Sequence, residues 1–180
     1  MTYVRRTTSE SDVTVELTAR TATPAASIST TDPFLDHMIT TLSRYGGFAL
    51  QLEASGDLDH HLAEDVALTL GRAIAEATTD TCARYGEATV PMDDALVTAA
   101  IDLGGRPYWG GALPDVAYDH FLRSLATEAR AALHVVVVRG HDPHHVTEAA
   151  MKAVGLAMRQ AMADGDTVFS LKGSVTWEVR

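Results

Sequence analysis

An internal repeat is the feature that most limits how this chain can fold. The segment GDLDHHLAED begins at Gly56, and the similar segment GHDPHHVTEA begins at Gly140. Three residues of each segment match at that offset: His60, His61 and Glu64 with His144, His145 and Glu148. An Asp-His pair upstream, ending in His37 and in His120, recurs at almost the same offset. The repeat predicts two homologous halves, residues 1–85 and 86–180.

Each half contains the same series of predicted elements. In the first half, Asp32 and Pro33 begin a helix, with Asp as its cap and Pro in its first turn, and Gly46-Gly47 ends it. Alternating apolar residues predict strands, and apolar residues at helical spacing predict helices. The predicted strands are residues 13–19, 48–54, 95–103, 133–139 and 169–179, and the predicted helices are residues 33–45, 61–77, 118–131 and 146–162. This order predicts an α+β fold, internally duplicated, with helices on one face of each sheet.

The composition limits the partners of the chain. Its 180 residues include 14 Lys and Arg against 24 Asp and Glu, a net charge of −10. Such a chain repels nucleic acid and anionic membranes, so we expect neither as a partner. The sequence has no apolar run of signal-peptide or membrane-span type, so a cytoplasmic location is expected. The single cysteine, Cys82, excludes an intrachain disulfide and a cysteine-based zinc cluster, and we interpret it as a small buried residue on a helix.

The two His-His-x-x-Glu segments are candidate metal ligands. On a helix, residues three or four positions apart share a face, so Glu64 would lie beside His60 and His61. Neighbouring histidines point about 100° apart on a helix, so one pair can serve two metals. Imidazole and carboxylate ligands together suit manganese, iron or zinc. We expect Asp59 and Asp65 to orient the imidazoles, and we interpret His134, within an apolar strand, as a core or supporting histidine.

Two other interpretations of these segments stay open at this point. The residues could be polar caps of solvated helices, since Glu near a helix N-terminus is favoured by the helix dipole. They could also form a structural or storage site for metal. The repetition at one offset, with an Asp-His pair upstream of each copy, argues against simple caps.

Beyond the repeat, the chain resembles the imidazoleglycerol-phosphate dehydratase family along nearly its whole length. The matching segments occur in family order: FLDHM (34–38), HHLAED (60–65), ARYG (83–86), VPMDDAL (90–96), DLGGRPY (102–108), HFLRSL (120–125), LHVVVVRG (133–140), HHVTEAAMKA (144–153) and SLKG (170–173). The resemblance implies loss of water from imidazole glycerol phosphate to give imidazole acetol phosphate in histidine biosynthesis. It implies a small phosphorylated substrate, two divalent metal ions per active site, manganese above all, and a homo-oligomer, a 24-mer built from trimers.

The resemblance also assigns roles to individual residues. The implied metal ligands are His37, His60, His61, Glu64, His120, His144, His145 and Glu148. The implied phosphate-binding residues are Arg84, Arg106, Lys152, Ser170 and Lys172, which would gather positive charge locally in an acidic chain. Glu10 matches a family glutamate near the reacting carbons, and we expect it to transfer a proton as the catalytic residue.

Several residues depart from the family pattern. Thr40-Thr41 and Tyr45 replace the usual residues of the first helix, the loop before His60 is shorter, and Leu171 replaces a small hydroxyl residue. No metal ligand is lost. Three functions therefore compete: this dehydratase, a divergent paralogue that acts as another metal-dependent enzyme on a phosphorylated small molecule, and a metal-binding structural protein. The phosphate-binding residues and Glu10 argue against the third.

Overall fold

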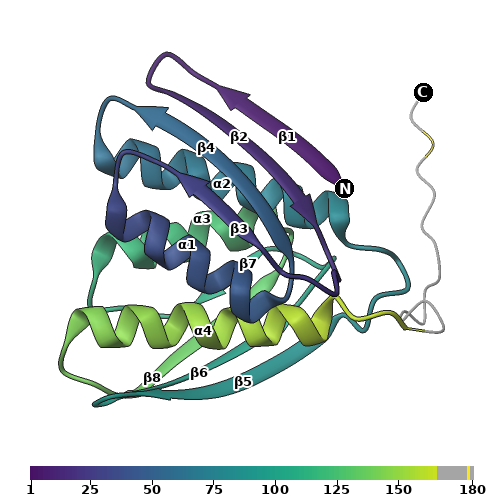
Figure 1. The fold of residues 1–180 in the computed structure, drawn as a ribbon. Helices are drawn as coiled ribbons and strands as arrows, with labels where there is room; N and C mark the ends of the chain where they lie inside the picture. Colours follow the sequence, from purple (N-terminus) through teal and green to yellow (C-terminus); the bar gives the residue numbers. More distant parts are fainter. Residues whose placement is uncertain (166–177, 179–180) are drawn as a thin grey trace.

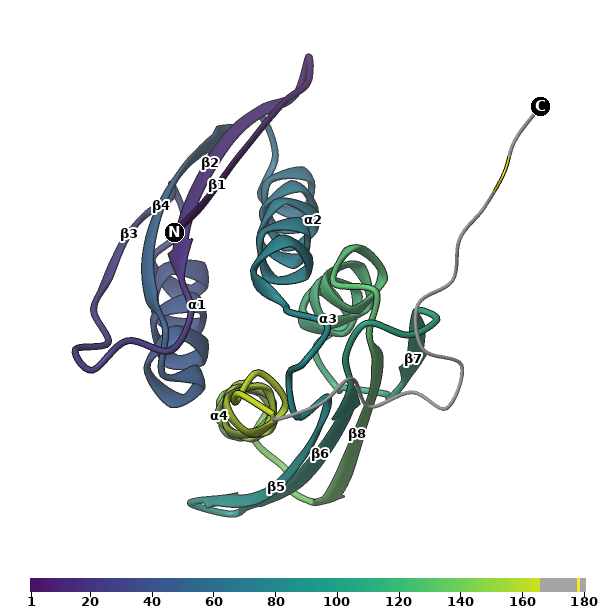
Figure 2. The ribbon, with the colours of Figure 1, turned by 90° about the vertical axis from the view of Figure 1, so that its right-hand side faces the viewer.

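Two four-stranded sheets form the outer layers of the molecule, and four helices lie between them (Figures 1 and 2). The computed structural model describes residues 1–165 and residue 178. The first half contains β1 (Thr2–Thr7), β2 (Ser11–Thr18), β3 (Ala26–Ser29), α1 (Pro33–Gly46), β4 (Ala49–Gly56) and α2 (Asp59–Ala77). The second half contains β5 (Tyr85–Met92), β6 (Ala95–Asp102), β7 (Tyr108–Gly110), α3 (Val116–Glu128), β8 (Ala132–Arg139) and α4 (Pro143–Ala161).

The two sheets have the same topology, which confirms the duplicated α+β fold. Their strand orders are β1-β2-β4-β3 and β5-β6-β8-β7. In each sheet the first three strands pair antiparallel and the short fourth strand pairs parallel to its neighbour. Every second residue of β2 and β6 is buried beneath the helices, as their alternating sequences predict.

The caps set the bounds of α1 as predicted. Asp32 accepts hydrogen bonds from the backbone N–H groups of Phe34 and Leu35, at 2.8 and 3.2 Å. Gly47 ends the helix in the left-handed conformation, with φ of 70°. Phe34 is only partly buried, because it lies at the exposed start of the helix against His144. The predicted helix at residues 118–131 begins earlier, at Val116, because Asp115 caps it.

Helices of opposite halves pack against each other, α2 on α3 and α1 on α4 (Figure 2). A Cβ atom added to Gly71 would lie 2.6 Å from the Leu125 carbonyl oxygen, and one added to Gly155 would lie 2.9 Å from the Leu42 carbonyl oxygen. These two glycines occupy equivalent repeat positions and permit both close approaches. The packing brings the Asp-His helix of each half onto the His-His-Glu helix of the other.

Some predictions need correction or lie outside the described residues. Cys82 is buried as expected, but it follows α2 in an isolated bridge to Asp164 rather than lying on a helix. The sequence did not indicate β1, β3, β5 or β7, of which β3 and β7 are very short. The strand predicted at residues 169–179 falls almost entirely on residues that the structure does not describe. Among the helices of residues 1–165, none is long and apolar enough to cross a membrane.

Candidate metal centre

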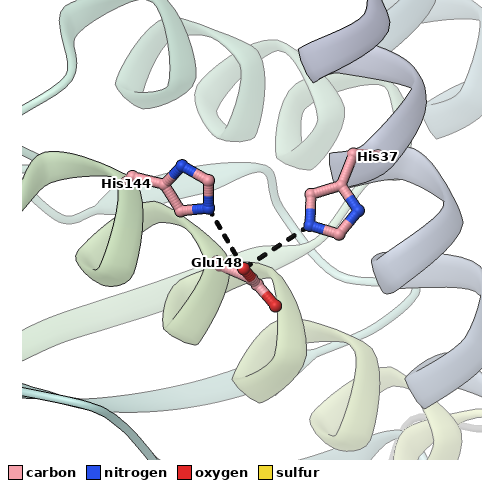
Figure 3. A group of neighbouring side chains, drawn as sticks. All are labelled: His37, His144 and Glu148. Atoms are coloured by element: carbon pink, nitrogen blue, oxygen red, sulfur yellow. Dashed lines mark ion pairs between the residues drawn. The ribbon is translucent and has the colours of Figure 1, made fainter.

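Three of the predicted ligands form one cluster at the start of α4 (Figure 3). His144 and Glu148 lie one turn apart on α4, and His37 reaches them from α1. The Nε2 atoms of His37 and His144 lie 3.5 and 3.3 Å from the same Glu148 carboxylate oxygen. All three residues offer ligand atoms within 4.8 Å of one another. Two imidazoles and one carboxylate in this arrangement suit a borderline divalent ion.

The repeat produces a related pair at the start of α2. His120 comes from α3, and its Nε2 atom lies 3.4 Å from Oε1 of Glu64 on α2. His60 lies one turn before Glu64, as His144 lies one turn before Glu148. Each half therefore supplies one histidine to the His-His-Glu helix of the other half. Within residues 1–165, neither half contains a complete cluster by itself.

The second histidine of each pair is held by carboxylates outside these clusters. The Nδ1 atom of His61 lies 3.1 Å from Asp57 and 3.6 Å from Glu10. The Nδ1 atom of His145 lies 2.7 Å from Asp94. A carboxylate at Nδ1 orients the ring and leaves Nε2 to bind a metal. The hydrogen bonds that His61 donates to Asp57 and His145 donates to Asp94 accordingly raise the pKa of both histidines.

These carboxylates differ from the ones that the sequence indicated. Asp65 is bonded to Arg6 and Ser11 rather than to an imidazole, because its position on α2 turns it toward the first two strands. Asp59 makes no hydrogen bond to a histidine within residues 1–165. One signal could have identified Asp94. It follows Glu10 by the same offset that separates Gly140 from Gly56, and both residues sit at hairpin turns beside the second histidine.

Glu148 is buried and negatively charged. Burial alone would raise its pKa, but the Lys152 ammonium at 2.9 Å and His37 outweigh burial, so the pKa of Glu148 is lowered. The carboxylate is therefore ionised and ready to act as a ligand. Lys152 also donates to the Met92 sulfur at 2.9 Å and lies over the Tyr45 ring at 5.8 Å. Among the predicted phosphate-binding residues that the structure describes, Lys152 is thus the one in direct contact with this cluster.

The other predicted phosphate-binding residues lie elsewhere in the chain or outside the described residues. Arg84 pairs with Asp102, with the Nε to Oδ1 distance at 2.6 Å, and its backbone N–H donates to Ala161 at the end of α4. More than three helical turns, about 20 Å, separate Ala161 from Glu148. Arg106 is exposed in the connection from β6 to β7. Ser170 and Lys172 lie outside the described residues, so the complete phosphate-binding set stays a prediction.

Two further histidines lie outside the clusters. His134 is exposed on β8, where its ring lies 5.2 Å from that of Tyr108. The core interpretation of His134 is therefore wrong, because alternation along β8 places it on the face away from the helices, and the other interpretation, a supporting histidine, stays a prediction. His141 lies in the loop before α4, and its backbone N–H donates to Asp94 at 2.6 Å.

Comparison with solved structures shows that the fold as a whole is similar to that of known enzymes. IGPD from Pyrococcus furiosus, solved in complex with (S)-C348, matches with a TM-score of 0.85 and 38% sequence identity over 95% of this chain and 99% of that one. Imidazoleglycerol-phosphate dehydratase from Staphylococcus aureus matches with a TM-score of 0.77 and 28% identity over 90% and 99%. The fold is thus that of a hydro-lyase, an enzyme class that removes water from its substrate.

Sequence comparison then identifies the family. The model of the imidazoleglycerol-phosphate dehydratase family matches residues 30–158. The dehydratase of Pyrobaculum calidifontis is 47% identical over 96% of this chain and 98% of its own length, and that of Corynebacterium jeikeium is 41% identical over 91% and 89%. The chain therefore belongs to the imidazoleglycerol-phosphate dehydratase family. The predicted family and the predicted enzyme class, hydro-lyase, are confirmed.

Proposed function

We propose that this chain dehydrates imidazole glycerol phosphate to imidazole acetol phosphate, as a metal-dependent step of histidine biosynthesis in the cytoplasm. Membership of the family supports the reaction and the pathway. One observation of this structure carries the proposal of metal dependence: His37, His144 and Glu148 converge from two helices, and His120 and Glu64 repeat the arrangement. The location rests on the family's biosynthetic role alone.

We propose manganese as the metal, held by the ligands that the sequence indicated. His37, His144 and Glu148 fit such an ion, because two exposed imidazoles face one ionised carboxylate. We assign His60, Glu64 and His120 to a second ion, and His61 and His145 to completing the coordination. When bound, divalent ions act as Lewis acids that stabilise negative charge on a substrate.

We propose that Glu10 transfers the proton. The proton to be removed is not adjacent to a carbonyl group, so the chain must offer a base close to where the imidazole of the substrate is held. The carboxylate of Glu10 is half exposed and lies 3.6 Å from the His61 ring. It is therefore beside a proposed metal ligand and still open to a substrate, which is the position that a general base requires.

Phosphate binding is the remaining requirement, and we propose that residues of more than one chain provide it. Lys152 lies at the metal cluster, whereas Arg84 lies near the far end of α4 in the same chain. A neighbouring chain would therefore bring its own Arg84 and Arg106, with Ser170 and Lys172, to complete the pocket around Lys152. Such a pocket would hold a phosphate and orient the substrate for reaction, despite the net charge of −10.

The direct test is product formation from imidazole glycerol phosphate. We expect imidazole acetol phosphate to form with manganese, to stop forming after chelation, and to form again when manganese is restored. Full activity in protein shown to be metal-free would contradict metal dependence. Stoichiometric manganese binding without any product would instead favour the divergent paralogue, an enzyme acting on another phosphorylated compound.

Manganese binding should weaken as the pH falls, because histidine ligands bind metal only in their neutral form. Hydrogen bonds donated to Asp57 and Asp94 raise the pKa of His61 and of His145, so protons compete with the metal at a higher pH than for ordinary histidines. The decline should therefore begin above about pH 6.5, the ordinary histidine value. Calorimetric titration at several pH values measures it, and Asp94→Asn should move the decline to lower pH. Constant affinity down to about pH 5 would contradict the ligand assignment.

A further inference from the structure

A partly buried polar cluster lies beside the N-terminal end of α2 but outside the proposed centre. Its middle is Asp65, whose side chain is only 9% exposed. Arg6 on β1 donates to Oδ1 of Asp65 from Nε at 3.0 Å, with Nη2 at 2.9 Å from the same oxygen. Ser11 donates through its hydroxyl to Oδ2, and the Thr8 hydroxyl lies 3.5 Å from that oxygen. We call Arg6, Thr8, Ser11 and Asp65 the Asp65 cluster.

The Asp65 cluster holds the turn that carries Glu10. The Thr8 hydroxyl accepts hydrogen bonds from the backbone N–H groups of Glu10 and Ser11, at 3.1 and 3.0 Å. On the other side, the Glu10 carbonyl accepts from the backbone N–H of Asp57 at 3.0 Å, and Asp57 in turn contacts His61. The backbone of Glu10 is therefore fixed from both directions relative to α2.

The second half of the chain shows that the fold does not need this cluster. At the repeat offset, each member is replaced by an apolar residue: Arg6 by Val90, Thr8 by Met92, Ser11 by Ala95 and Asp65 by Ala149. The strands around them keep the same pairing, since Arg6 pairs with Val13 and Val90 pairs with Val97. Val90, Ala95 and Ala149 are buried and apolar, and Met92 is partly buried with its sulfur accepting from Lys152, so the second half has no carboxylate at this place.

An ion pair in such a place is weak evidence for stability. Removing a carboxylate from water is unfavourable, and well-packed apolar residues of similar volume often stabilise a protein as much or more. The apolar version already exists in the same molecule. The polar version is therefore explained better by what it holds in place than by a contribution to folding.

We propose that the Asp65 cluster positions Glu10 against the histidines of α2, and that the chain confines this arrangement to its first half because only that half supplies the proton-transferring carboxylate. The inference rests on the proposed role of Glu10. Asp65 is in this view a positioning residue, since it acts through the turn and contacts no substrate. Asp94, the counterpart of Glu10, is held in a different way. Its carboxylate accepts from the backbone N–H of His141 and contacts the ring of His145 at the start of α4.

The second half supplies the test variant. Replacing the cluster with its counterparts, Arg6→Val, Thr8→Met, Ser11→Ala and Asp65→Ala, should leave a folded protein with unchanged manganese content. Turnover should fall on the order of tenfold to 100-fold with little change in KM, because a misplacement of about 1 Å can cost about 100-fold. The backbone amides of Glu10 and Ser11 should exchange hydrogen faster, since their acceptor on Thr8 is removed. Asp65→Asn is the milder variant, which keeps the side-chain shape and should show a smaller loss.

The matched control lies on the same two strands. Arg5 and Asp12 form an exposed ion pair, with an N–O distance of 2.7 Å, and within the described residues neither side chain bonds to the Glu10 backbone. Replacing both with Ala should leave turnover within about twofold, because exposed ion pairs contribute little. Equal losses in the control and in the cluster variant would overturn the proposal.

Combination with Glu10→Gln separates positioning from general damage. If the cluster acts through Glu10, the fourfold variant should lose little further turnover in the Glu10→Gln background. An undiminished loss in that background, or parental turnover in the fourfold variant alone, would overturn the inference. If the parent protein forms no product, the proposed function fails instead. Hydrogen exchange of the Glu10 and Ser11 backbone amides then still tests whether the cluster holds the turn. An exchange rate unchanged in the fourfold variant would overturn the inference.

Discussion

Glu10→Gln should lower the turnover of imidazole glycerol phosphate by about 100-fold or more while leaving the manganese content unchanged. The amide keeps the size of the carboxylate but cannot accept the proton. Glu10 lies 3.6 Å from His61 without belonging to either convergent cluster, so its loss should leave the ligands in place. Steady-state kinetics with metal analysis of the same samples measures both quantities.

Glu53→Gln is the matched control for this variant. Glu53 is exposed on β4, in the same sheet as the Glu10 turn, and the same charge is removed. We expect turnover close to that of the parent. Near-parental turnover in Glu10→Gln as well would assign Glu10 to the protein surface and would leave the proton transfer to another residue.

Removal of metal should reduce the assembled protein to a much smaller species. By family resemblance we expect a 24-mer in the presence of manganese and trimers after chelation, an approximately eightfold loss of mass. The side chains of His37, His120 and His144 are about half exposed in the single chain, so a neighbouring chain could reach each proposed centre. A metal that binds only between chains stabilises the assembly by roughly RT ln(1 + [L]/Kd) per site.

Sedimentation with and without chelator measures this change. The double variant His60→Ala and His61→Ala should behave like chelated protein even when manganese is present, because it loses two of the three proposed ligands on α2. His141→Ala is a suitable control, since its imidazole lies outside both clusters. An active species of 19.2 kDa under both conditions would rule out centres shared between chains.

Two of the residues that depart from the family pattern lie in different surroundings, and this bears on whether the chain is a divergent paralogue. Thr41, one of the departures from the family pattern, is buried in α1, and Tyr45 lies against Lys152 beside the metal cluster. Among the substituted residues within residues 1–165, Tyr45 therefore lies where it could affect the proposed binding of a phosphate at Lys152. The Tyr45→His variant restores the usual residue of the family. Its activity on imidazole glycerol phosphate can be compared with that of the parent in the same assay.

The sequence by itself determined the duplication, the presence of the four helices, the bounds of α1 and the residue types of the proposed centre. Local rules suffice for these features, since Asp32 with Pro33 begins a helix and Gly47 ends it whatever lies nearby. The repeated His-His-x-x-Glu segments likewise place Glu148 beside His144 through the helical period alone.

Only the tertiary structure decided which equivalent residues meet. A repeat offset shows that His37 corresponds to His120, but it does not show that each joins the helix of the opposite half. That exchange depends on the close packing of helices at Gly71 and Gly155. The turn of Asp65 away from the histidines depends likewise on how α2 lies over β1 and β2. These contacts join residues distant in sequence, so neither hydrophobic period nor motif spacing contains them.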